Sequence, residues 1–200
     1  YLSDNTYATF DINGFESFNI TGTVGNDIIN TATAGAGNTV YGGEGNDTLT
    51  GGDGGDVLDG GKGNDTFNNV GVGDIVAGGA GTDTVNFNIS TQTEDTTINL
   101  LTGVGIVASW TGVEYATGTL GTGNDTVTAA MQLTYLEGNS GTDSLTLDYS
   151  GTLADGRTAT RLNFTYLNNS NDEYVYLSDN TYATFDINGF ESFNITGTVG

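Results

Sequence analysis

Residues 42–68 read GGEGNDTLT, GGDGGDVLD and GGKGNDTFN, three consecutive units of nine residues. Each unit follows the pattern G-G-x-G-x-D-x-U-x, where U is a large apolar residue. The apolar position is taken by Leu49, Leu58 and Phe67, so it recurs in one register. Three such copies in succession are not expected by chance, even in a chain that contains 33 glycines. The stretch therefore predicts a solenoid, in which successive units stack along an axis.

The residue types of this unit divide it into a turn and a strand. Glycine takes the dihedral angles of a tight turn without strain, so the first six positions predict a turn. The carbonyl groups and the aspartate of that turn are hard oxygen ligands, of which Ca²⁺ binds about six to eight. The last three positions predict a short strand whose middle side chain points inward. We therefore expect calcium in the turns and an apolar column inside the stack.

This nonapeptide resembles the repeat of the RTX (repeats-in-toxin, hemolysin-type) calcium-binding proteins, and the whole chain resembles giant tandem-repeat RTX proteins of bacterial surfaces. The resemblance implies an all-β fold, a right-handed parallel β-helix (β-roll) solenoid with calcium in its turns. In that family two units complete one coil, which places each ion between one unit and the unit two further on. It also implies export by a type I system of a Gram-negative bacterium, with folding outside the cell or at its surface.

Units of this type run from residue 22 to residue 86, and a shorter set runs from 120 to 146. Asn38 and Thr134 stand where two of the units lack the aspartate. The predicted calcium ligands, for several ions in each repeat, are Asp27, Asp47, Asp56, Asp65, Asp74, Asp83, Asp125 and Asp143. The coil rule of the family pairs Asp27 with Asp47, Asp47 with Asp65, Asp65 with Asp83, Asn38 with Asp56, Asp56 with Asp74, and Asp125 with Asp143.

The two ends of the sequence are identical. Residues 1–25 recur without a change at residues 176–200, an offset of 175 residues. An engineered duplication would produce such a period, and so would a tandem array in a very long chain. The last residue, Gly200, comes just before the Asn-Asp pair that would begin the next unit, which favours the array. We therefore expect neighbouring identical repeats as partners, head to tail in a filament.

The pattern divides the chain into two modules of the same plan, units followed by a β-rich excursion. Aromatic residues gather in the second excursion, which makes it the one stretch that could fold without metal. Glu114 and Glu191 occupy similar places where the two excursions return, and we interpret them as structural caps or peripheral ligands. The predicted segments are 1–21 (end of the preceding repeat), 22–90 (first RTX block), 91–119 (excursion and return), 120–149 (second, short RTX block), 150–196 (aromatic-rich excursion and return) and 197–200 (start of the next block).

Composition excludes several classes of function. The chain carries 25 acidic and 3 basic residues, a formal charge of −22, which disfavours nucleic acid or an anionic membrane surface and favours cations. It has no cysteine, so disulfides cannot staple a secreted form. No apolar run approaches the length of a membrane span. Without histidine or cysteine the usual general bases and thiol nucleophiles are missing, and we interpret Glu94 and Asp95 as a solvated turn. We therefore expect no enzyme.

The leading hypothesis is a calcium-binding structural repeat of a large secreted or cell-surface protein, serving as an adhesin stalk, a surface layer or an extracellular fibre. One apolar residue per nine cannot offset the conformational entropy of ordering the backbone, so we expect the units to fold only with Ca²⁺. A second hypothesis is an adhesin module that binds glycan or ice. A third is the calcium-dependent carrier region of an exported enzyme.

Overall fold

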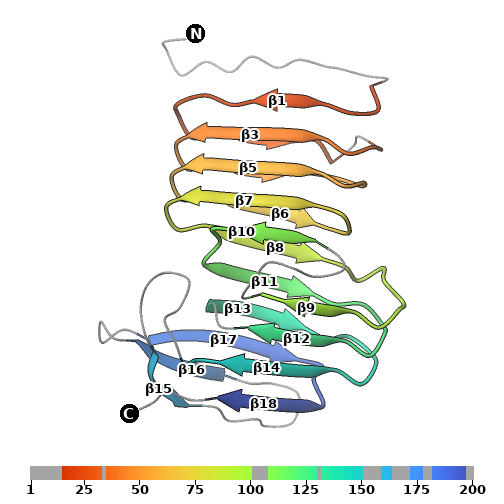
Figure 1. The fold of residues 1–200 in the computed structure, drawn as a ribbon, viewed down its shortest axis with the longest axis vertical. Helices are drawn as coiled ribbons and strands as arrows, with labels where there is room; N and C mark the ends of the chain where they lie inside the picture. Colours follow the sequence, from red (N-terminus) through yellow and green to blue (C-terminus); the bar gives the residue numbers. More distant parts are fainter. Residues whose placement is uncertain are drawn as a thin grey trace.

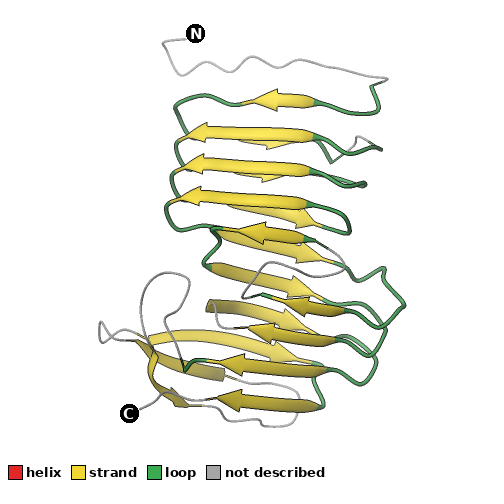
Figure 2. Cartoon of the chain, viewed as in Figure 1, coloured by secondary structure: helices red, strands yellow, loops and turns green. Residues whose placement is uncertain are grey.

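The computed structural model describes residues 15–32, 35–100, 108–129, 132–150, 159–163, 172–177 and 182–196. Within these ranges the chain is all β, with eighteen strands and no helix (Figures 1 and 2). The strands form three sheets that stack into one elongated body (Figure 1). The predicted fold class, a parallel β-roll, is therefore confirmed. Residues 1–14 of the first predicted segment, and all of the segment 197–200, lie outside the described residues.

Each sheet takes its strands from distant parts of the sequence. From one edge to the other, sheet A consists of β1 (Asn19–Thr21), β3 (Thr39–Glu44), β5 (Val57–Lys62), β7 (Ile75–Ala80) and β10 (Ser109–Thr111). Sheet B consists of β15 (Ala159–Asn163), β16 (Asp172–Leu177), β17 (Tyr182–Asn188), β13 (Gln132–Glu137), β11 (Tyr115–Thr119), β8 (Thr84–Asn88), β6 (Thr66–Val70), β4 (Thr48–Thr50) and β2 (Ile28–Asn30). Sheet C consists of β18 (Ser192–Thr196), β14 (Ser144–Asp148), β12 (Thr126–Ala129) and β9 (Thr97–Asn99).

The register of the parallel strands follows the nine-residue unit. Val40 pairs with Leu58 in sheet A, and Leu49 pairs with Phe67 in sheet B. These four side chains are at most 1% exposed and belong to one hydrophobic core. Consecutive units thus alternate between the two sheets, and every second unit returns to the same sheet. Two units complete one coil, as the resemblance implies.

The segment 91–119, predicted as an excursion, supplies three parallel strands to the stack. Strand β10 pairs with β7 and ends sheet A, whereas β11 pairs with β8 and extends sheet B. Strand β9 pairs with β12 and begins sheet C. Sheet C lies below sheet A in Figure 1, with its strands pointing in the same direction. The chain therefore changes sheet on one side while the stacking continues.

Two large aromatic side chains fill the core where the sheets change. The rings of Phe87 and Trp110 stack with their centroids 5.9 Å apart, and both side chains are buried. Phe87 has this place because Gly118 pairs with it from the neighbouring strand and has no side chain. A methyl group on Gly118 would overlap the Phe87 ring. The glycine is thus required by packing.

Replacing Gly118 by alanine should destabilise the fold, because the added methyl group has no space beside Phe87. Overpacking of this kind costs about 1 to 3 kcal/mol. Calcium-saturated Gly118→Ala should melt at a lower temperature than the parent chain. Adding Phe87→Leu should recover part of the loss, since the smaller side chain leaves room for the methyl group. An unchanged melting temperature in the single variant would contradict this packing.

The second predicted excursion contains an antiparallel hairpin. Strands β15 and β16 pair antiparallel, and β16 pairs antiparallel with β17. Strand β17 then returns to the stack, parallel to β13. The excursion therefore adds three strands to the end of sheet B, β15, β16 and β17, whereas sheet C ends in β18.

Candidate metal centre

The predicted calcium ligands form columns at the turns that join the sheets. Each aspartate comes directly before a strand of the stack, so the eighteen-residue register of the strands places these residues one above another. Asp27, in the first described coil, is half-buried. The other predicted ligands are at most 1% exposed, and they are Asp47, Asp56, Asp65, Asp74, Asp83, Asp125 and Asp143.

In each column one carboxylate oxygen accepts a hydrogen bond from the backbone of the preceding coil. The Oδ1 atom of Asp47 accepts the N–H of Asp27 at 2.8 Å, and that of Asp65 accepts the N–H of Asp47 at 2.8 Å. The Oδ1 atom of Asp83 likewise accepts the N–H of Asp65 at 2.8 Å. The side chains therefore form a continuous aspartate ladder along one edge of the solenoid.

The other two columns follow the same rule. The N–H of Asn38 donates to Asp56 Oδ1 at 2.7 Å, and the N–H of Asp56 donates to Asp74 Oδ1 at 2.8 Å. In the second block the N–H of Asp125 donates to Asp143 Oδ1 at 2.7 Å. All the pairs expected from the coil rule thus lie in adjacent coils. The structure adds Thr96 to the last column, where its N–H donates to Asp125 Oδ1 at 2.8 Å.

Two glutamates end the ladders. The Oε2 atom of Glu114 accepts the N–H of Asp83 at 2.8 Å, and that of Glu191 accepts the N–H of Asp143 at 2.6 Å. In both cases the glutamate stands two residues after a glycine, Gly112 or Gly189, with positive φ. The sequence located these glutamates as caps or peripheral ligands, and the structure places their carboxylates in line with the aspartates.

The second carboxylate oxygen of most of these aspartates is buried without a partner. Six Oδ2 atoms have no hydrogen bond to any described residue, those of Asp47, Asp56, Asp65, Asp83, Asp125 and Asp143. Asp27 and Asp74 differ, because their Oδ2 atoms accept the backbone N–H groups of Thr23 and Gly71. An unpaired buried carboxylate oxygen is strongly unfavourable unless a cation lies beside it. The six orphaned oxygens therefore point to bound cations.

Backbone carbonyl oxygens converge on the same points. A methyl group built on Gly60 would overlap Asp65 Oδ2 and lie 2.7 Å from the carbonyl oxygen of Gly78, in the next coil. One built on Gly78 would overlap the carbonyl oxygen of Gly112 and lie 2.6 Å from Asp83 Oδ2. The first glycine of a unit thus leaves a cradle between a carboxylate and a carbonyl group. These are the hard oxygen ligands that Ca²⁺ prefers.

Burial of the ladder makes ionisation costly without a cation. Burial raises the pKa of Asp83 to about 6, with further increases from the carboxylates of Asp65 and Glu114, although a backbone hydrogen bond from Asp65 opposes the shift. Burial likewise raises the pKa of Asp74 to about 6. The ordinary pKa of the aspartate, in the unfolded chain, is 3.8. Because the pKa in the folded chain is higher, the metal-free fold is most stable below pH 3.8 and loses stability as the pH rises through 6. Near neutral pH a cation must therefore offset the cost of burying these charges.

The candidate sites rely on backbone carbonyl groups more than on clusters of acidic side chains. Among the residues that the structure describes, no group of three acidic side chains converges on one point. Each candidate site instead combines the carboxylates of adjacent coils with carbonyl groups of the glycine turns. The residues present therefore fit Ca²⁺, provided that the turn carbonyls supply most of the ligands.

A second ladder was not predicted from the sequence. At the fifth position of the unit, the N–H of Asn46 donates to Asn26 Oδ1 and the N–H of Asn64 donates to Asn46 Oδ1, both at 2.8 Å. The N–H of Thr82 donates to Asn64 Oδ1 at 2.9 Å. Here each coil donates to the preceding one, opposite to the aspartate ladder. The signal was asparagine before aspartate in alternate units, at a position that the repeat pattern treats as variable.

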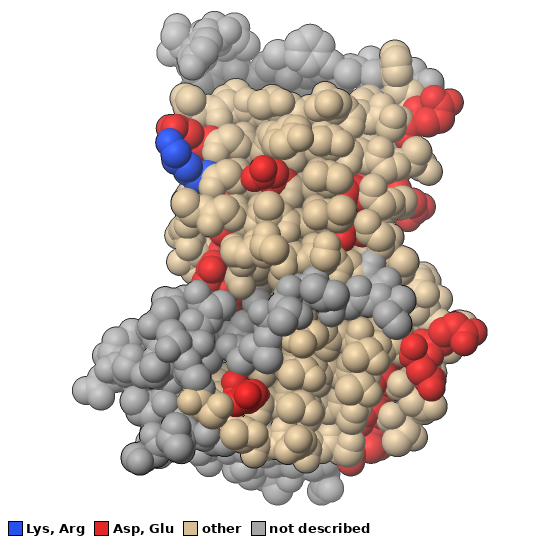
Figure 3. All heavy atoms as spheres, in the orientation of Figure 1, with Lys and Arg blue, Asp and Glu red and all other residues tan. Residues whose placement is uncertain are grey.

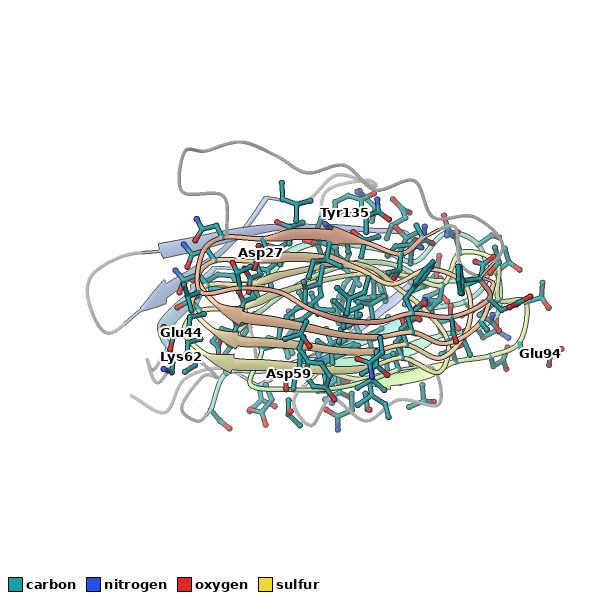
Figure 4. All side chains as sticks on the ribbon, turned by 90° about the horizontal axis from the view of Figure 1, so that it is seen from above. Asp27, Glu44, Asp59, Lys62, Glu94 and Tyr135 are labelled. Atoms are coloured by element: carbon teal, nitrogen blue, oxygen red, sulfur yellow. The ribbon has the colours of Figure 1, made fainter. Side chains whose placement is uncertain are left out.

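The outer face of the turns carries an exposed ion pair. Lys62 Nζ lies 2.6 Å from Glu44 Oε1 in the neighbouring coil, and both side chains are mostly exposed. Figure 4, which looks along the stack, places this pair at one end of the coil and Glu94 at the other end, pointing outward. Exposed ion pairs of this kind contribute little to stability. The buried ladders, and not this pair, therefore dominate the electrostatics of the turns.

A family model for the RTX calcium-binding nonapeptide repeat (4 copies) matches residues 33–67. Searches of curated proteins and of solved structures found no match to the chain. No helix in the described ranges is long and apolar enough to cross a membrane. RTX repeats bind Ca²⁺ in their turns and typically occur in secreted, extracellular proteins. The predicted RTX repeats are therefore confirmed over residues 33–67.

Proposed function

We propose that this chain is a structural repeat of a giant bacterial surface protein, a stalk or fibre that calcium stiffens after export. The observation that carries the proposal is the ladder from Asp27 to Glu114, which connects every coil of the first block to the next. In a solenoid each coil contacts only its neighbours, so stiffness depends on these coil-to-coil links. Cations bridging adjacent coils would turn a weak stack into a rod.

The proposed role is not enzymatic. Asp95 Oδ1 accepts the N–H of Asn124 at 2.8 Å, so this carboxylate bridges two coils, while its neighbour Glu94 points outward (Figure 4). A hollow of 270 Å³ beside Asp53 is lined by Val72 and by glycine, amide and hydroxyl groups, with no second acid and no basic residue among its lining residues. Neither place offers the pair of carboxylates that acid–base hydrolysis needs. These arrangements support a structural role.

The charge of the surface suits a protein that meets calcium outside the cell. Among the described residues, acidic side chains appear along both edges of the visible face and also within it, and basic ones at one place only (Figure 3). The formal charge of −22 would repel the coils from one another at low calcium. The same charge would attract divalent cations after secretion, when the rod is needed.

Electron microscopy of the chain with and without calcium tests the proposal. With calcium we expect elongated particles whose length corresponds to a rise of about 4.8 Å per coil. In excess chelator the particles should disappear, because the coils lose their links. Magnesium alone serves as the control ion and should not restore the rods, since it demands tighter, octahedral coordination. Compact particles of the same size in both states would contradict a calcium-stiffened rod.

A further inference from the structure

The same five-residue sequence contributes a strand at both ends of the structure, with different neighbours. The sequence SFNIT occurs at residues 17–21 and at residues 192–196. The first copy contains β1, the first strand of sheet A, which pairs with β3. The second copy is β18, the last described strand of sheet C, which pairs with β14. The same strand sequence therefore has a neighbour on its C-terminal side in the first copy, β3, and a neighbour on its N-terminal side in the second copy, β14.

The two copies bond their neighbours through opposite edges. In the second copy, Ser192 donates its N–H to the carbonyl of Asp143, and the carbonyl of Thr196 accepts the N–H of Tyr149. These positions correspond to Ser17 and Thr21 in the first copy.

In the first copy the bonds are made by the alternate positions, Phe18 and Gly22. The carbonyl of Phe18 accepts the N–H of Thr39 at 2.8 Å, and its N–H donates to Asn38 Oδ1 at 3.0 Å. Gly22 donates its N–H to the carbonyl of Tyr41 at 2.7 Å. Successive residues of a strand point their backbone groups to opposite sides. Both sets of bonds can therefore be made at once by a single strand.

The glutamate before this strand is also used twice, through different atoms. In the second copy, Glu191 Oε2 ends the ladder by accepting the N–H of Asp143. In the first copy the equivalent residue, Glu16, accepts the N–H of Ala36 with its backbone carbonyl at 3.0 Å. The carboxylate thus serves the coils before the strand and the carbonyl serves the coils after it.

We propose that consecutive 175-residue units share this strand, so that sheet C of one unit continues without a gap as sheet A of the next. The inference rests on the tandem array of the proposed function, and it names the surface that joins the units. The partner of β18 is β3 of the following unit. Leu147 pairs with Ile195, and the equivalent Ile20 pairs with Val40, so the apolar column also runs through the junction.

The position of β1 supports this assignment. Among the described strands, β1 is the edge strand of sheet A and pairs on one side only, with β3. Sheet B is different, because the hairpin of β15 and β16 already pairs with β17 at that end. The junction is therefore carried by the sheet that contains the shared strand.

Disulfide trapping in a chain of two units, residues 1–200 followed by a second copy of 26–200, tests the junction. The chain has no cysteine, so any cross-link is unambiguous. Asn19 and Thr39 are paired in register, which predicts the same pairing between Asn194 and Thr39 of the second unit. Paired residues of adjacent strands lie about 4.8 Å apart, within the range that a disulfide spans. With calcium, Asn194→Cys and Thr39→Cys of the second unit should therefore cross-link on mild oxidation.

Val57 of the second unit provides the matched control, because it lies one strand beyond Thr39 in the same register. Asn194→Cys with Val57→Cys of the second unit should remain reduced. The pair Asn19→Cys and Thr39→Cys within the first unit should cross-link and shows that the chemistry works. If that internal pair forms but the junction pair does not, the proposal that consecutive units share this strand is wrong. The rods seen by microscopy would then still support the structural role, so the two failures are distinguishable.

Discussion

Removing calcium should abolish the β-sheet signal of residues 22–86. Strands β3 to β8 each bury one or two apolar side chains, and four buried carboxylate oxygens of these coils lack a partner among the described residues. With the pKa of Asp83 raised to about 6, its carboxylate is charged near neutral pH, where it accepts a hydrogen bond from the backbone of Asp65 in the neighbouring coil. Repulsion along the ladder then opposes folding, and the apo coils should be unfolded, as in other systems where the metal completes the fold.

Circular dichroism during a calcium titration measures this effect. The contribution of residues 22–86 at low calcium should be that of a disordered segment, and the β-sheet signal should rise steeply with calcium, because each ion bridges two coils and so favours its neighbours. Magnesium at the same concentration should have little effect. A β spectrum that persists in excess chelator would show that apolar packing alone holds the coils.

Gly60→Ala should weaken calcium binding and Gly35→Ala should not. The methyl group on Gly60 would overlap Asp65 Oδ2 and crowd the carbonyl oxygen of Gly78, so it would occupy the cradle of the ion. The same methyl group on Gly35 meets nothing within 4 Å. Neither glycine has positive φ, so the comparison isolates the added volume from backbone strain. We expect the calcium dissociation constant of Gly60→Ala to rise by about fivefold to about 150-fold, given an overpacking cost of about 1 to 3 kcal/mol.

Isothermal titration calorimetry on both variants measures the difference, and thermal melting in saturating calcium provides a second readout. Gly35→Ala should match the parent chain or melt slightly higher, because alanine restricts the unfolded chain. Equal affinities in the two variants would show that no cation lies beside Gly60. A loss of melting temperature in Gly60→Ala without a loss of affinity would assign this glycine to packing only.

The stacking of the coils could be predicted from the sequence because each unit repeats the same pattern of glycine, aspartate and apolar residues. The apolar residues at 49, 58 and 67 fix which face points inward, and the nine-residue spacing fixes the register. The aspartate pairs follow from that register without knowledge of the turn geometry. The two oxygens of one carboxylate could not be distinguished in this way, since their different partners depend on the exact path of the glycine turns.

The change of sheets could not be predicted, because its strands carry little local signal. Strands β9 and β10 have three residues each, and the G-G-x-G-x-D pattern does not precede either of them. Their places are set by distant contacts, such as the stacking of Trp110 on Phe87. The asparagine ladder was missed for a different reason. A repeat pattern marks a position as variable when several residue types occur there, even where one of them makes the same hydrogen bond in alternate units.

The two glutamate turns limit the register in which the repeated coils can stack. A coil that docked one place early, 18 residues out of step, would keep its apolar contacts and its aspartate pairing, so a repetitive chain can misfold at little cost. The turn from Gly112 to Glu114 is shorter than a nonapeptide turn, and it leads to β11, where Gly118 receives the Phe87 ring. Only one coil can precede that turn correctly. Glu114 and Glu191 therefore mark the last coil of their aspartate ladders, and a coil docked out of step would lose this match.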